Sequence, residues 1–283
     1  MLKIDSQTNV RDRSQVQPLN ARVIDRQDLT ERLTILRISY ESGDTLPFKA
    51  GQFVKLGIVA DNDLGNNYSL SSIVPKRNQM VQRAYSICSS PAQTGYLEFL
   101  IDLVPHGNLT PKLWRLNKGD RLWMEPRARG KFTLDGIEEH QNIFMVCTGT
   151  GIAPFISMLS QYVSKERWNR LVLVHGARNF KHLAYYDEIL ALAQENISIS
   201  YIPLLSREPD DSDWQGCRGR VQRLFHKDEI EQITNVKLNP ERSHAYICGN
   251  TNMIKTMTDL LGNWNFTKGS NSKPGNIHSE RYW

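Results

Sequence analysis

The spacing of apolar and polar residues changes character near the middle of the chain. In the first half, short apolar segments recur at close intervals, at residues 21–24, 33–38, 48–58, 83–91, 96–103 and 121–125. Val54, Leu56 and Ile58 share one face of the third segment, because side chains alternate between the two faces of a strand. Short strands separated by turns at this spacing predict a small antiparallel barrel.

The strand predicted at residues 96–103 has a regular alternation. Glu98 and Asp102 are expected to face outward, and the apolar residues beside them to face inward. The inward set is Leu97, Phe99, Ile101 and Leu103.

A short helix is predicted between the last two of these strands. Thr110 is a favourable N-cap, and Pro111 suits the first helical position. Gly107 and Asn108 come just before, and a helix N-terminus with a flexible lead-in binds anions readily. An ordinary capped helix explains the same residues, so this segment alone does not decide between the two.

In the second half, strands alternate with helices. Apolar strands are predicted at residues 143–147, 171–175, 197–205 and 245–248. Helices are predicted from the turn at residues 148–155 to about residue 163, around residues 181–193 and from about residue 250. This succession predicts a doubly wound parallel sheet. The expected architecture is therefore an antiparallel barrel domain at residues 20–135 followed by an α/β domain at residues 136–283, with residues 1–19 as a disordered leader.

Composition narrows the function classes. The chain has 283 residues, with 40% hydrophobic and 23% charged residues, which suits a globular protein of two domains. Its net charge of +5 is spread along the chain, which gives little support to nucleic-acid binding. The four cysteines lie far apart, and no apolar run approaches the length of a membrane span. We therefore expect a cytoplasmic monomer without a clustered metal site, a membrane segment or a nucleic-acid partner.

The strand around residues 83–91 carries the most suggestive chemistry. Arg83 and Tyr85 share one face, while Ser86 turns to the other. A guanidinium at that position suits a phosphate group, and a tyrosine ring suits a planar ligand ring. An ordinary strand with a half-buried tyrosine explains the pattern equally well when it is taken alone.

Three pieces of the second half lie where parallel strands end, which is where such sheets bind ligands. The turn Thr148-Gly149-Thr150-Gly151 opens a helix containing Pro154, so backbone N–H groups there suit a pyrophosphate. The pattern is Gly-x-Gly-x-x-Pro and differs from the dinucleotide fingerprint Gly-x-Gly-x-x-Gly. It is therefore a weak indication by itself.

The other two pieces are a set of arginines and a cysteine. Arg178, Arg207 with Ser206, and Arg220 suit a phosphate monoester such as the 2′-phosphate of NADP, although single arginines are more often only solvated. The third piece is Cys248-Gly249-Asn250, where a cysteine is most often just small and buried.

Taken in order, an Arg-x-Tyr-Ser strand, Gly-Thr-Gly-x-Ala-Pro, Cys-Gly-Asn and a terminal Tyr-Trp resemble the ferredoxin/flavodoxin–NADP reductase family of bacteria. The resemblance covers residues 21–283. It implies an FAD-containing oxidoreductase that exchanges electrons between NADP(H) and ferredoxin or flavodoxin, in which the flavin links two-electron and one-electron chemistry.

The resemblance also implies roles for single residues. Around FAD, it implies that Arg83 binds the pyrophosphate and that Tyr85 and Tyr282 cover the two faces of the flavin. Ser86 is expected near the reactive flavin nitrogen, and Trp283 is expected to extend toward the adenine. The flavin's phosphates are expected to be held by Gly107, Asn108, Leu109 and Thr110. Around NADP, the pyrophosphate is expected to be cradled by Thr148, Gly149, Thr150, Gly151 and Pro154. The 2′-phosphate is expected to be recognised by Arg178, Ser206, Arg207 and Arg220. Gly249 and Asn250, which follow Cys248, are expected to border the same cofactor. Cys248 and Glu280 stand at the nicotinamide, and Ser86, Cys248, Glu280 and Tyr282 form the catalytic set.

Two features have no counterpart in this resemblance, and two rival functions remain open. The loop at residues 59–80 is longer than expected for the compact bacterial members of the family, and the polar leader is an extra segment. Neither contains any of the motifs.

The first rival function is an NAD(P)H reductase that passes electrons to free flavin, quinone or an oxygenase partner. The second is a non-catalytic binding module that retains the fold.

Overall fold

The computed structural model of the protein describes residues 19–59, 80–165, 167–226, 228–269 and 274–282. The predicted leader lies outside these ranges except for Leu19, as do most of the predicted long loop and Trp283. Within the described ranges, the helices are too short or too polar to cross a membrane.

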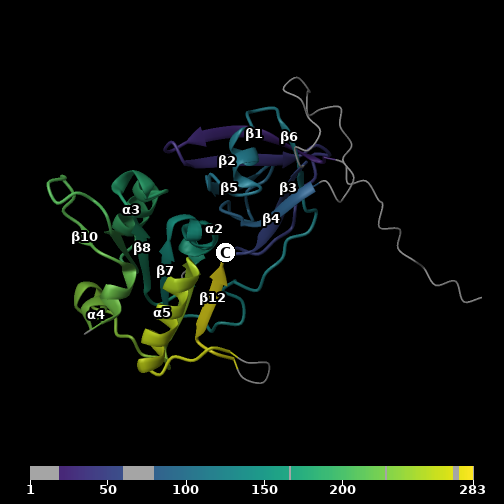
Figure 1. The fold of residues 1–283 in the computed structure, drawn as a ribbon. Helices are drawn as coiled ribbons and strands as arrows, with labels where there is room; N and C mark the ends of the chain where they lie inside the picture. The colour runs from purple at the N-terminus through teal and green to yellow at the C-terminus, as the bar shows by residue number, and fades with distance from the viewer. Residues whose placement is uncertain (1–18, 60–79, 166, 227, 270–273, 283) are drawn as a thin grey trace, which may run out of the picture.

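The first half of the chain folds into one antiparallel sheet. Its strands are β1 (Ala21–Asp28), β2 (Leu33–Tyr40), β3 (Phe53–Val59), β4 (Met80–Ser86), β5 (Leu97–Asp102) and β6 (Arg121–Met124), in the order β4-β3-β6-β1-β2-β5. Just beyond β4, the amide of Cys88 donates a hydrogen bond of 2.8 Å to the carbonyl of Glu98 on β5. That bond joins the two ends of the order, so the sheet closes as the predicted barrel (Figure 1).

The short helix α1 (Thr110–Trp114) packs on the barrel through Leu109 and Leu113. It begins one residue earlier than predicted, because Leu109 and not Thr110 is its N-cap. The Thr110 hydroxyl instead accepts a hydrogen bond from the Val104 amide and donates one to the Val104 carbonyl. Thr110 therefore stabilises the loop before the helix, and the predicted cap was wrong.

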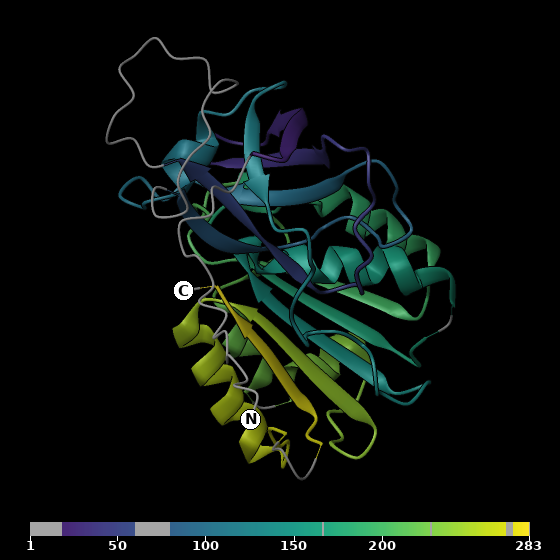
Figure 2. The same ribbon diagram turned by 90° about the vertical axis from the view of Figure 1, so that its right-hand side faces the viewer.

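The second half forms a parallel sheet with helices on both faces, which confirms the predicted fold class (Figures 1 and 2). Its strands are β7 (Asn142–Thr148), β8 (Leu171–Ala177), β9 (Ile199–Leu205), β10 (Cys217–Arg218), β11 (Ser243–Gly249) and β12 (Ile277–Arg281), in the order β10-β9-β8-β7-β11-β12. Its helices are α2 (Ala153–Tyr162), α3 (Tyr186–Glu195), α4 (Glu229–Thr234) and α5 (Thr251–Asn263), with 3₁₀ turns η3 (Gly149–Ile152), η4 (Val163–Lys165), η5 (Phe180–His182) and η6 (Val221–Phe225).

Alternation along β7 assigns the two faces of this sheet to two cores. Met145 and Cys147 contact a core that includes α2, while Phe144 and Val146 contact a core that includes α5. Asn250 begins α5 as predicted, since its side chain accepts hydrogen bonds from the amides of Asn252 and Met253. The helix predicted after β7 begins as the 3₁₀ turn η3, and the helix predicted at residues 181–193 is η5 followed by α3.

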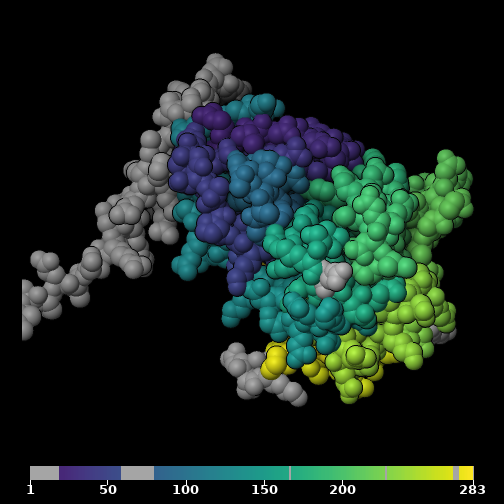
Figure 3. All heavy atoms as spheres, turned by 180° about the vertical axis from the view of Figure 1, so that it is seen from behind, coloured from purple at the N-terminus to yellow at the C-terminus, as the bar shows by residue number. Residues whose placement is uncertain are grey.

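The core on the α2 face also contains barrel residues, so the two domains share it. Leu33, Leu100 and Phe132 lie in the same cluster as Phe155 and Met158 of α2. In the space-filling view the barrel, in purple and blue, packs directly against the second domain, in teal and green (Figure 3). The interface therefore resembles a protein interior, which favours a fixed orientation of the two domains.

This shared core corrects the prediction for β5. Glu98 was expected to face outward but is buried, because the second domain covers the face on which solvent was expected. Leu100 on that face is also buried, whereas Leu103, expected inward, is half-buried and lies beyond the end of the strand.

Several short elements of the second domain were missed. They are the strands β10 and β12, the helix α4 and the 3₁₀ turn η6. β12 matters most, because it pairs in parallel with β11 at the edge of the sheet and ends next to the barrel (Figure 1).

The cysteines are all reduced, and most are inaccessible. Cys88, Cys147 and Cys248 are fully buried, while Cys217 is half-exposed. Burial raises the pKa of the Cys88 thiol to about 12 and raises the pKa values of Cys147 and Cys248 as well. The buried thiols are therefore protonated and unreactive in the folded protein.

The tight packing around Gly51, beneath the barrel-side Phe132 and next to α2, can be tested by substitution. Gly51 and Gly43 both have positive φ, at 97° and 76°, but only Gly51 is crowded: a Cβ there would overlap the Phe132 carbonyl oxygen and approach the Met158 side chain. Gly43→Ala should cost about 1 kcal/mol of stability through its backbone conformation. Gly51→Ala should cost about 1–3 kcal/mol more, because overpacking adds to that strain. Urea unfolding of both variants checks this, and equal losses would contradict the tight contact.

Candidate active site

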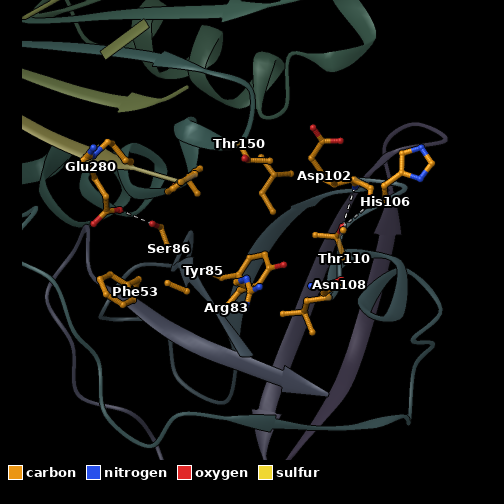
Figure 4. A pocket seen from close by; sticks show the side chains of 18 residues that line it. Phe53, Arg83, Tyr85, Ser86, Asp102, His106, Asn108, Thr110, Thr150 and Glu280 are labelled. Atoms are coloured by element: carbon orange, nitrogen blue, oxygen red, sulfur yellow. Dashed lines mark hydrogen bonds between the residues drawn. The ribbon is translucent and has the colours of Figure 1, made fainter. Parts of the chain in front are cut away.

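A cavity of about 620 Å³ opens between the two domains. It is bounded by the end of β4, the end of β5, the loop that leads into α1, the start of α2 and the end of β12. Its lining residues are Phe53, Arg83, Ala84, Tyr85, Ser86, Leu100, Asp102, Val104, His106, Gly107, Asn108, Leu109, Thr110, Thr150, Ala153, Glu280, Arg281 and Tyr282. Figure 4 shows Tyr85 near the middle, Ser86 with Glu280 at one end, and Asp102 with Thr110 at the other.

The β4 residues lie where the alternation places them. Arg83 and Tyr85 stand together, and Ser86 is directed toward Glu280 (Figure 4). Arg83 is exposed and donates a hydrogen bond of 2.7 Å to the neighbouring Gln82 carbonyl, which leaves most of its guanidinium available to a ligand. Tyr85 packs on the barrel core, and burial raises the pKa of its phenol, so the ring is neutral.

Three of the four predicted catalytic residues, Ser86, Glu280 and Tyr282, line one end of the cavity, and the fourth, Cys248, is fully buried behind Tyr282. The Ser86 hydroxyl donates a hydrogen bond of 2.8 Å to Glu280 Oε1. Glu280 is opposite Cys248 in the β11–β12 register. Burial raises the pKa of the Tyr282 phenol, and Cys248, Glu280 and Ser86 are the groups that interact with it. Residues far apart in the sequence therefore share one small volume.

Glu280 supplies the carboxyl side chain of this cluster, and its pKa is shifted. Burial raises its pKa to about 7, and the hydrogen bond from Ser86 partly opposes the rise. At neutral pH the side chain therefore occupies both protonation states, which is the condition for moving a proton at Oε1.

The loop before α1 forms the other end of the cavity. Gly107, Asn108, Leu109 and Thr110 all line it, as predicted for an anion-binding segment. Leu109 also reaches the barrel core, so the loop is anchored on its far side. Their role toward a phosphate remains a prediction.

A second group of predicted residues surrounds the ends of β7 and β11. Gly149 has φ of 55°, and a Cβ on Gly151 would overlap the Cys248 carbonyl oxygen. Thr148 accepts a hydrogen bond from the Asn250 amide, and Gly249 passes against it with φ of 139°. Small residues are required here because two strand ends and a helix start meet within contact distance.

The predicted 2′-phosphate residues lie together beyond the ends of β8 and β9. The Arg207 amide donates to the Arg178 carbonyl at 2.8 Å, and Ser206 donates to the Ala177 carbonyl at 3.1 Å. Arg178, Arg207 and Arg220 are exposed, and their guanidinium groups form no hydrogen bond or ion pair with any described residue. Three exposed cations at strand ends suit a ligand with a dianionic group, and Arg178 also interacts electrostatically with Asp102.

Several cavity residues were missed by the sequence analysis. They are Phe53, Ala84, Leu100, Asp102, Val104, His106, Ala153 and Arg281. Burial raises the pKa of Asp102, which was expected on an outward face. Its position at the end of a strand beside a Gly-Asn loop could have indicated a ligand site. Among the described residues, no group of three or more His, Cys, Asp or Glu side chains is arranged to hold a metal ion.

Comparison with known proteins assigns both halves of the chain. Residues 20–132 match the oxidoreductase FAD-binding domain model, and residues 145–259 match the oxidoreductase NAD-binding domain model. The flavodoxin/ferredoxin–NADP reductase of Buchnera aphidicola subsp. Baizongia pistaciae is 35% identical over 239 residues, covering 84% of this chain and 88% of the relative. The reductase of the same name from Escherichia coli K12 is 32% identical over 240 residues, covering 84% and 89%.

A solved structure agrees with these matches. The ferredoxin NADP⁺ reductase from Neisseria gonorrhoeae with bound FAD and NADP superposes with a TM-score of 0.79 at 27% identity. The superposition covers 93% of this chain and 98% of the other.

The raised pKa of Glu280 has a measurable effect on stability. The folded group binds a proton up to about pH 7, whereas the unfolded group releases it near its ordinary value of 4.5. Stability contributed by Glu280 should therefore fall as pH rises from 4.5 to 7. Glu280→Gln should remove that loss, so the variant should gain on the order of 3 kcal/mol relative to wild type between pH 4.5 and 8.

Urea unfolding of flavin-free protein across this pH range measures the effect. Glu139→Gln is the matched control, because Glu139 is exposed and forms no hydrogen bond or ion pair with described residues. A stability difference between Glu280→Gln and wild type that does not change with pH would disprove the assignment.

Proposed function

The chain belongs to the ferredoxin/flavodoxin–NADP reductase family, and from that premise we propose that the interdomain cavity is where nicotinamide and flavin meet. The protein is an FAD-dependent oxidoreductase that exchanges electrons between NADP(H) and a one-electron carrier protein. The observation that supports the location is the convergence of Ser86, Cys248, Glu280 and Tyr282 beside the Tyr85 ring.

The residues around the cavity fit FAD. When bound, the flavin supplies the exchange between a two-electron hydride and single electrons. The Tyr85 ring offers a flat apolar surface, and Phe53 and Leu100 add apolar walls. Arg83 provides a cation for the pyrophosphate, and the segment at residues 107–110 provides backbone donors near the other end of the cavity.

The cluster at Glu280 would orient the reacting groups. Glu280 fixes the Ser86 hydroxyl through the 2.8 Å hydrogen bond, and it can hold or release a proton near neutral pH. Cys248 is fully buried next to Tyr282, so displacement of Tyr282 would expose this small side chain to a nicotinamide ring. Tyr282 would cover the flavin face that nicotinamide needs and be displaced by it. Trp283 lies outside the described residues, and its expected place near the adenine stays a prediction.

The NADP site would extend from this cluster along the strand ends of the second domain. Thr148 to Gly151 with Pro154 would hold the pyrophosphate, and Gly249 and Asn250 would border it. Arg178, Ser206, Arg207 and Arg220 would bind the 2′-phosphate. Their exposure and free guanidinium groups support this assignment.

The domain boundary, the oligomeric state, the location and the carrier protein are also proposed. The domains would divide at residues 135 and 136, and the protein would act as a cytoplasmic monomer. Ferredoxin or flavodoxin is the expected carrier, and the net charge of +5 would attract such an acidic partner. The names of the two relatives described above include both flavodoxin and ferredoxin.

An electron-transfer assay tests this function. Purified protein should be yellow, oxidise NADPH and reduce added flavodoxin or ferredoxin. The carrier-dependent rate should fall as salt rises, because screening weakens electrostatic steering, while the rate with a small neutral acceptor should fall much less. A colourless protein that leaves NADPH unchanged would indicate a non-catalytic module. Equal salt sensitivity with both acceptors would exclude a charged carrier and favour free flavin or quinone.

The 2′-phosphate assignment is tested at Arg207. A charge-assisted contact to phosphate is worth about 1.5–3 kcal/mol, so Arg207→Ala should lower kcat/KM for NADPH about tenfold or more. The value for NADH should barely change, because NADH lacks that phosphate. Arg242→Ala is the control, since Arg242 is exposed just before the opposite end of β11. Equal losses with NADPH and NADH in Arg207→Ala would show that the phosphate binds elsewhere.

A further inference from the structure

A tyrosine of the second domain crosses the interface and bonds to the barrel. The Tyr185 hydroxyl donates a hydrogen bond of 2.8 Å to Glu98 Oε1 on β5. We infer that this Tyr185–Glu98 contact is a positioning contact, which sets where the NADP-binding domain holds nicotinamide relative to the flavin. The inference rests on the function proposed above and adds two residues that act through the orientation of the domains.

Glu98 is buried in a way that requires both domains. Its residue surface is 8% exposed, and a buried carboxylate is costly unless its oxygens are satisfied. Arg37, opposite Glu98 in the β2–β5 register, donates to Oε2 at 2.8 Å and also pairs with Asp25. Oε1 receives its donor from Tyr185. The barrel therefore satisfies one carboxylate oxygen, and the second domain satisfies the other.

Tyr185 has an unusual backbone conformation at this point. It has φ of 60° and ψ of 23°, in the left-handed region, and it forms the N-cap of α3. A bulky residue adopts this conformation only where surrounding contacts hold it there. The conformation brings the hydroxyl to Glu98, whereas the next residue, Tyr186, packs with Phe180 and Trp214 of its own domain.

The segment before Tyr185 is tied to the proposed 2′-phosphate site. The Asn179 side chain donates to the Arg207 carbonyl at 2.7 Å, and the Phe180 amide donates to Glu208 at 2.9 Å. Arg178 begins this segment and Tyr185 ends it. A short, internally bonded segment therefore connects the arginines that would hold NADP to the residue that contacts the barrel.

The strand on the barrel side is tied to the cavity. Glu98, Leu100 and Asp102 alternate along β5, so they share one face, and Leu100 and Asp102 line the cavity. The Tyr185–Glu98 contact therefore acts on the strand that forms a wall of the proposed flavin site. Lys181 and Glu31 form a second ion pair across the interface at 3.0 Å, but both side chains are more than half exposed. Exposed ion pairs contribute little to stability, so the buried Tyr185–Glu98 hydrogen bond is a stronger restraint on the position of the segment at residues 178–185 than the Lys181–Glu31 pair.

Tyr185→Phe removes the hydroxyl and keeps the ring. In flavin-loaded protein mixed anaerobically with NADPH, the rate of flavin reduction should fall about tenfold or more, because small misplacements of reacting groups cost that much or more. The Kd for NADPH should change less than about twofold, since the phosphate contacts stay in place. Tyr186→Phe is the matched control, because its hydroxyl forms no hydrogen bond with described residues. It should match wild type in both values.

A second variant and a second measurement complete the test. Glu98→Gln should slow flavin reduction in the same way, and the double variant should be little slower than either single one. In flavin-loaded protein without NADPH, amide hydrogen exchange over residues 183–189 should be faster in Tyr185→Phe than in wild type or Tyr186→Phe. If Tyr185→Phe does not fold, Glu98→Gln carries the same expectations.

Two outcomes separate this inference from the proposed function. A wild-type protein whose flavin is not reduced by NADPH would overturn the function itself. An active wild type, with Tyr185→Phe that is merely less stable and reduces flavin at the normal rate, would overturn the positioning role alone.

Discussion

The pairing of β12 along β11 is the constraint on which the site depends. This register sets Glu280 opposite Cys248 and brings Tyr282 to the cavity, and the hydrogen bond from Ser86 then ties the strand end to the barrel. An edge strand held on one side only would fray more easily than a central one. The contact with Ser86 therefore stabilises the strand that carries Glu280 and leads directly into Tyr282.

The shared core gives this arrangement its rigidity. Leu33, Leu100 and Phe132 from the barrel side pack with α2, so separation of the domains would expose the interior of both. Within that apolar contact, polar groups are paired across the boundary: Ser157 donates to the Ser89 carbonyl at 2.7 Å in the same way that Tyr185 donates to Glu98. Apolar burial supplies the strength of the interface, and these directional bonds fix its geometry.

Hydrophobic patterning was sufficient to predict the barrel, the parallel sheet and the start of α5, because each is a regular element with one dominant period. It was not sufficient for β12, where Ile277 is followed by His278, Ser279 and Glu280 and no alternation of apolar residues exists. That strand forms because β11 offers it an edge, which is a property of the assembled sheet. Glu98 was misassigned for a related reason, since one strand cannot reveal that another domain covers its charged face.

The site, like the fold, could be predicted only where the signal lies within one segment of the sequence. The residue types at strand ends and glycine turns indicated anion and ring binding, and the structure places Ser86, Glu280 and Tyr282 around one cavity with Cys248 buried behind them. Phe53 and Arg281 were missed because they reach the cavity only through neighbours on other segments. Their contribution depends on tertiary contacts that alternation along a single strand does not encode.

The distribution of thiols gives the chain its own markers of local opening. Alkylating reagents attack thiolates, so Cys88, Cys147 and Cys248 can be modified only in molecules whose core has opened. Cys88 follows the last residue of β4 by two positions, whereas Cys147 and Cys248 are central in the parallel sheet. All three lie in the core that the two domains share, so timed labelling read by mass spectrometry would report separation of the domains as modification of all three thiols, with half-exposed Cys217 as an internal reference for labelling time.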